Sequence, residues 1–122
     1  MTTLDGCFDE VSRALNFPNY FGRNWDALDE CLVDLSWLPA PAYVLLIDSA
    51  LDVLREESVE QLETLLRILG RAASEWAVPI ALGEPWDRPA APFHTVLHEA
   101  PGREAALWQR CEQAGVAIDR LA

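Results

Sequence analysis

Residues 17 to 37 read FPNYFGRNWDALDECLVDLSW and predict a loop that leads into one short helix. With Asn24 as N-cap and 100° per residue from Trp25 to Leu35, the side chains separate by chemistry. One arc of the helix is apolar and holds Ala27, Leu28, Cys31, Leu32 and Leu35. The opposite arc holds Asp26, Asp29, Glu30, Val33 and Asp34. We therefore expect one face to join the core and the other to form an acidic surface that no basic residue neutralises.

The acidic face carries like charges at helical spacing. Asp26 faces both Asp29 and Glu30, and each such pair costs the helix about 0.2 to 0.5 kcal/mol. Asp26 and Asp29 recover part of this cost because they lie near the positive end of the helix dipole. A face that repels itself and exposes Val33, with Trp25 at its edge, favours a cationic partner. A solvated helix face is the alternative interpretation.

The loop before this helix brings aromatic and amide groups to the helix N-terminus. Pro18 and Gly22 turn the chain sharply, and Tyr20 lies between them. Tyrosine beside carboxylates is typical of protein interfaces. The same stretch resembles the signature of the barstar family, the intracellular inhibitors of small secreted bacterial ribonucleases. The matching residues are Pro18, Tyr20, Gly22, Asn24, Asp26-Ala27-Leu28 and Cys31-Leu32.

This resemblance implies an α/β domain whose second helix and preceding loop block the active site of the ribonuclease. Its carboxylates then occupy positions that RNA phosphates would take. By the resemblance, Glu30 falls at the family's most important aspartate, and Asp29 stands where the family has a tryptophan. A late glutamate of the long helix corresponds to Glu75, with Arg71 as the competing position. The implied partner-binding residues are Tyr20, Gly22, Asn24, Trp25, Asp26, Asp29, Glu30, Val33 and Glu75.

The charge of the chain is concentrated where this motif lies. The formal net charge is −11; residues 1 to 61 hold 12 acidic and 3 basic side chains, and residues 62 to 122 hold 8 and 6. Such a field repels nucleic acid and attracts basic proteins. The binding of barnase by barstar is itself a standard example of this steering.

At 122 residues the chain predicts a single domain with a sizeable core. Cys7, Cys31 and Cys111 are isolated and odd in number, so we expect free thiols in a reducing cytoplasm. The sequence shows no signal peptide before Asp5 and no apolar run long enough to span a membrane.

The remaining chain predicts an α/β domain with a small, mainly parallel sheet packed by helices. We expect helices from Asp5, as the cap, to Leu15, over 51–56, from a Ser58/Gln61 capping box onward, and over 104–114. Strands are expected over 43–47, buried on both faces, and over 78–82, 93–98 and 116–121. Residues 1–83 resemble the family, and 84–122 form a strand-helix-strand extension that restores sheet area.

The sequence supports a catalytic function less well than a binding function. His94 and His98 lie about 13 Å apart along a strand, too far to share a metal ion, although a helical placement would bring them together. Cys31 faces the core, and nearby acids raise a thiol pKa, which disfavours a nucleophile. A catalytic pair of carboxylates needs one raised and one ordinary pKa, which burial can produce. The carboxylates of this helix are expected to be exposed, so they lack that desolvation.

The sequence therefore predicts a non-catalytic inhibitor without cofactor or metal, which blocks the basic cleft of a small extracellular ribonuclease. An acidic adaptor or immunity protein that binds another basic protein is the second hypothesis. A small hydrolase is the third.

Overall fold

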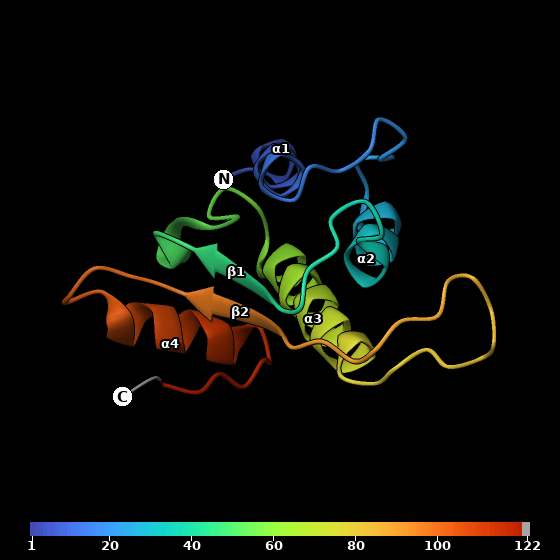
Figure 1. Ribbon diagram of the computed structural model, residues 1–122. Helices are drawn as coiled ribbons and strands as arrows, with labels where there is room; N and C mark the ends of the chain where they lie inside the picture. The colour runs from blue at the N-terminus through green and yellow to red at the C-terminus, as the bar shows by residue number, and fades with distance from the viewer. Residues whose placement is uncertain (121–122) are drawn as a thin grey trace.

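The computed structural model describes residues 1–120 and has four helices and two strands (Figure 1). The helices are α1 (Leu4–Ala14), α2 (Trp25–Asp34), α3 (Val59–Trp76) and α4 (Glu104–Gln113). The strands β1 (Tyr43–Ile47) and β2 (Phe93–Leu97) pair in parallel, and a short 3-10 turn, η1 (Ala50–Asp52), follows β1. The predicted mixed α/β class is confirmed. No helix within residues 1–120 is long and apolar enough to cross a membrane.

Helix α3 is the centre of the domain and lies between α2 and the sheet, whereas α4 runs beside β2 (Figure 1). The apolar side of α3 is buried, as the periodicity predicts. Each fully buried leucine stabilises the fold by about 1.5 to 3 kcal/mol. The indole of Trp76 also donates to the carbonyl of Leu32, at 2.8 Å, and so joins the end of α3 to α2. The buried residues of these two helices include Leu28, Leu32, Leu62, Leu65, Leu66, Leu69 and Trp76.

The sheet has two strands in register, with Tyr43 opposite Phe93 and Ile47 opposite Leu97. The strand over 93–98 therefore supplies the sheet contact expected of the C-terminal region. The prediction that β1 is buried on both faces was wrong, because Val44 and Leu46 are exposed. Only the side with Tyr43 packs against α3, where its ring lies 4.9 Å from that of Trp76.

The structure differs from the sequence prediction at the starts of three helices. Thr3, not Asp5, caps α1, since its hydroxyl accepts from the Gly6 amide at 3.1 Å. The helix predicted over 51–56 is only the single turn η1 followed by further turns. The capping box at Ser58 does not form: the Ser58 side chain makes no cap bond, and the Gln61 amide oxygen accepts from the indole of Trp25 instead.

Two predicted strands are not formed. Residues 78–82 contribute only an isolated bridge from Ile80 to Arg88, because no strand lies alongside the rest of the segment and Pro79 lacks an amide donor. Residues 116–120 are irregular, and position 121 lies outside the described residues. The end of α4 is as expected, with Gly115 at φ +73° just after the C-cap, a conformation that favours glycine.

Candidate functional site

The loop before α2 is a tight turn that presents Tyr20. The amide of Phe21 donates to the carbonyl of Pro18 at 3.0 Å, so Asn19 and Tyr20 form the tip. Phe21 packs edge-on against Phe8 and Phe17, with ring centroids 5.9 and 4.9 Å away. This aromatic base holds the turn in place, and the Tyr20 side chain stands out from it with 74% of its surface exposed.

The loop is also anchored to α1. Arg23, at φ +52°, donates to the carboxylate of Asp9 at 2.6 Å, and this bond with the nearby acidic charges raises the pKa of its guanidinium. Gly22 packs closely against the start of α2. A Cβ at this position would lie 3.3 Å from the side-chain Nδ2 of Asn24 and 3.5 Å from the Cβ of Ala27. A side chain at residue 22 therefore crowds the start of α2.

Two of the predicted contact residues have internal roles at the helix start. The Asn24 side chain accepts from the Ala27 amide at 2.8 Å and donates to the Gly22 carbonyl at 3.3 Å, so the predicted N-cap is confirmed. Trp25 is half-buried; its ring packs 5.2 Å from that of Phe8, and its indole donates to Gln61 at 2.7 Å. These bonds fix the direction in which the loop and the acidic face point.

The exposed face of α2 carries three carboxylates along its length, at Asp26, Glu30 and Asp34. Within residues 1–120, none of the three forms a side-chain ion pair within 4.0 Å. Residues four apart on a helix have Cβ atoms about 6 Å apart, so the carboxylates form a regular row. This row is free to bind cationic groups from outside the molecule.

The expectation that no basic residue neutralises the face was wrong at one position. Arg71 of α3 donates to both carboxylate oxygens of Asp29, at 2.8 Å each, and the Asp29 side chain is only 28% exposed. Glu75, one turn further along α3, lies 3.9 Å from the same guanidinium. Arg71 thus contacts α2 directly, and Glu75 lies next to Arg71.

Sequence reasoning missed Arg88, which closes the C-terminal end of α2. Its guanidinium donates to the carbonyls of Val33 and Asp34, at 2.7 and 3.1 Å, and lies 3.4 Å over the ring of Trp76. Burial there lowers the pKa of Arg88. Val33 is half-buried, not exposed as expected. A cation at the negative end of a helix is stabilising, but nothing local in the sequence connects Arg88 to α2.

The three thiols are free and buried. Burial raises the pKa of Cys31, and the charges of Asp34 and Glu30 raise it further, as the sequence predicted. Burial also raises the pKa of Cys7 to about 11. All three thiols remain protonated at neutral pH, since burial also raises the pKa of Cys111. No group of three or more potential metal ligands occurs in the described part of the chain.

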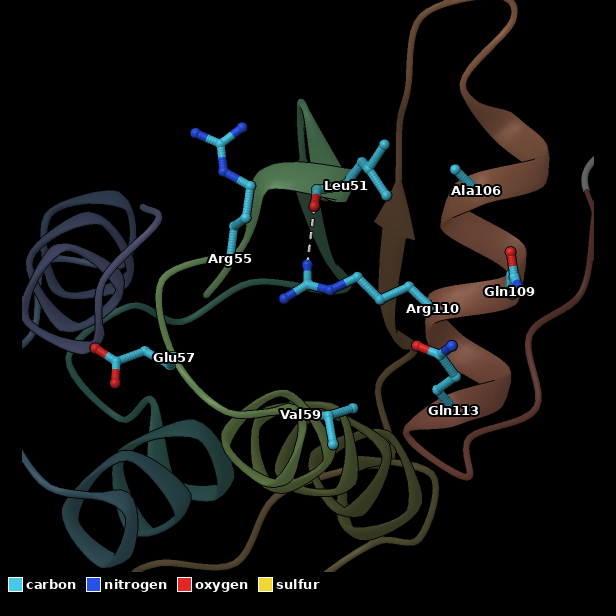
Figure 2. Close-up of a pocket in the computed structure, with 8 residues that line it drawn as sticks. All are labelled: Leu51, Arg55, Glu57, Val59, Ala106, Gln109, Arg110 and Gln113. Atoms are coloured by element: carbon cyan, nitrogen blue, oxygen red, sulfur yellow. Dashed lines mark hydrogen bonds between the residues drawn. The ribbon is translucent and has the colours of Figure 1, made fainter.

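A surface hollow of about 340 Å³ lies between η1, the start of α3 and α4, and no α2 residue lines it (Figure 2). The Arg110 side chain extends into it and donates to the Leu51 carbonyl at 2.9 Å. Arg55 is paired with Asp52 at 3.0 Å, and Glu57 accepts from the Leu4 amide at 3.1 Å. These charged groups bond within the protein, whereas Asp26, Glu30 and Asp34 of α2 form no ion pair within residues 1–120.

Comparison with protein families gives a match to the family described as Barstar (barnase inhibitor), over residues 1–98. The match begins before α1 and continues past Gly83 through β2, so α4 alone of the helices lies beyond it. The division of the chain at residue 83 stays a prediction. Neither a comparison with curated proteins nor one with solved structures gives a match.

The family's members are inhibitors rather than enzymes and bind barnase-like ribonucleases. The matched range covers most of the chain and contains the whole loop and α2. Together with the α/β fold, this match shows that the chain belongs to the barstar family of barnase inhibitors.

Proposed function

We propose that the protein inhibits a small secreted bacterial ribonuclease by covering its basic active-site cleft with the loop at 17–24 and the exposed face of α2. The observation that carries this proposal is the row of Asp26, Glu30 and Asp34, which forms no ion pair within residues 1–120. An exposed Tyr20 stands on the hydrogen-bonded turn that leads into this helix. Membership of the barstar family supports the same conclusion.

The mechanism follows from the chemistry of the cleft. A ribonuclease binds RNA phosphates with arginine, lysine or histidine, and carboxylates at regular spacing on a helix present negative charge to the same cations. Asp26 and Glu30, one turn apart, bind these groups. Tyr20 contributes a large, rigid contact surface at the end of the row. RNA is then excluded because its phosphate sites are occupied.

The net charge of −11 favours the same class of partner. It attracts a basic protein over a distance of about a Debye length and repels RNA, so inhibitor and substrate do not associate with one another. We further propose a cytoplasmic location, since all three buried cysteines are free thiols. There the inhibitor protects the producing cell, or gives immunity to a neighbour's toxin.

A second candidate is an acidic adaptor or immunity protein for a basic protein that is not a ribonuclease. The observation that favours it is the ion pair of Asp29 with Arg71 at 2.8 Å. By the resemblance, Asp29 stands where the family has a tryptophan, so this pair would take the place of a stacking contact with a ribonuclease. The two candidates share the acidic face and differ only in the partner.

The experiment that separates them is a titration of the protein against a barnase-like enzyme and several small microbial ribonucleases, with RNA cleavage as the readout. The proposal predicts inhibition that saturates near one to one and weakens with added salt. Ribonucleases that retain full activity at stoichiometric protein would contradict it and favour the adaptor. Turnover of RNA or other substrates by the purified protein alone would contradict both.

A further inference from the structure

The loop between α3 and β2, residues 77–92, projects from the molecule on the side of the view where α2 lies (Figure 1). It is well braced despite its length. The backbones of Ile80 and Arg88 bond to one another in both directions, at 2.9 and 3.0 Å. At the tip, the Asp87 carboxylate accepts from the Leu82 and Gly83 amides at 3.0 and 2.7 Å. These bonds hold the loop in one conformation before any partner arrives.

The same loop is joined directly to α2. Arg88, at its base, donates to the Val33 and Asp34 carbonyls at the end of the helix, and its guanidinium stacks on Trp76. The position of the loop relative to the carboxylate row is therefore fixed by two hydrogen bonds and a cation-π contact. The base of the loop thus contacts the C-terminal end of the helix that carries the row.

Large apolar side chains on this loop are left uncovered. Leu82 is 72% and Trp86 is 62% exposed, and Val78 at its base is also exposed. A single exposed apolar residue is ordinary, but several on a projecting, internally bonded loop indicate an interaction site. A rigid aromatic anchor loses little conformational entropy on binding, which is the property of residues that dominate interface energies.

We propose that residues 78–88 form a second arm of the docking surface, whose Trp86 and Leu82 pack against an apolar rim beside the basic cleft of the same ribonuclease. This inference rests on the proposed function. The partner is the same because Arg88 connects the arm to α2. With Tyr20 at one end and Trp86 at the other, the row of carboxylates is flanked by aromatic contacts that exclude water from the ion pairs.

The test compares Trp86→Ala and Leu82→Ala with a matched control, Trp108→Ala, on α4. Trp108 is 41% exposed, and among residues 1–120 its indole bonds within its own helix, to Glu112 at 3.1 Å. We expect each loop variant to raise the Kd for an inhibited ribonuclease about tenfold or more, and the control to leave it unchanged. The loss at Trp86 should be the same at low and high salt because the contact is apolar, whereas the loss in Glu30→Ala shrinks with salt.

Hydrogen exchange gives a second readout, with slower exchange in both α2 and residues 78–88 on complex formation. If the wild type is inhibitory and Glu30→Ala weakens it, but Trp86→Ala binds normally and the loop gains no protection, the second arm is overturned and the proposed function stands. If the wild type inhibits no ribonuclease, both are overturned. A wild-type dimer that Trp86→Ala converts to monomer, with ribonuclease affinity unchanged, would assign the loop to self-association instead.

Discussion

Replacement of Glu30 by alanine separates binding from folding, because this side chain is exposed and unpaired in the free protein. No ion pair of Glu30 lies within 4.0 Å in residues 1–120. Its loss removes like-charge repulsion along α2, worth about 0.2 to 0.5 kcal/mol per pair. The free energy of unfolding of Glu30→Ala should therefore equal that of the wild type or exceed it slightly.

In the proposed complex we expect the same substitution to be severe. If the interface buries the cationic group that Glu30 faces, loss of one member of this ion pair costs about 3 to 5 kcal/mol. This corresponds to a roughly 100- to 4,000-fold rise in Kd. Asp29→Ala should cost less than Glu30→Ala, since Arg71 already compensates the charge of Asp29 in the free protein.

The assay is a calorimetric or stopped-flow measurement of Kd against an inhibited ribonuclease, with Glu60→Ala as control. Glu60 is an exposed glutamate on α3, so its removal changes the net charge by the same amount and leaves the α2 carboxylates in place. Similar affinities for Glu30→Ala and Glu60→Ala would refute the assignment of the α2 face to binding. Unfolding of Glu30→Ala in urea at a lower midpoint than wild type would refute its placement as a free, exposed group.

Three further predictions concern the residues around this face and the acid stability of the fold. Asn24→Ala removes the bond to the Ala27 amide and should lower the free energy of unfolding in urea by about 1 kcal/mol, and an unchanged midpoint would contradict the capping role. Arg71→Gln makes the face more negative, so the association rate at low salt should rise a few fold in stopped flow; a slower rate would mean that Arg71 itself contacts the partner. Hydrogen bonds from backbone amides hold the pKa of Glu99 below its usual value, so its stabilising contribution is present above the unfolded pKa near 4.3 and is lost as pH falls through the folded value. Glu99→Gln should therefore lower Tm at pH 7 and approach the wild type near pH 3, and a Tm difference independent of pH would exclude this linkage.

The parts of the site that sequence predicts are those determined locally. The acidic face, the Asn24 cap and the buried Cys31 follow from spacing within one short segment, and all three are found in the structure. The bonds that complete the site join residues far apart in sequence: Arg71 to Asp29 across 42 positions, and Arg88 to Val33 across 55. No periodicity within one segment reports on such contacts, because they depend on how α3 packs against α2.

The two wrong predictions about strands also concern contacts between segments that are far apart in sequence. Residues 78–82 have the apolar composition of a strand, but a strand also needs a neighbour along its length, and only Ile80 finds one. The run at 43–47 was expected to be buried on both faces because it is continuously apolar. Its outer face is open because the sheet has two strands and packs against α3 on one side.

The most direct test of the central claim is a competition between this protein and a mononucleotide that occupies the active site of an inhibited ribonuclease. If the loop and α2 cover the phosphate-binding cations, the apparent Kd of the protein must rise in proportion to nucleotide concentration once the site is saturated. An affinity that does not change at saturating nucleotide would mean that the protein binds elsewhere on the enzyme, and would contradict the proposed block of the cleft.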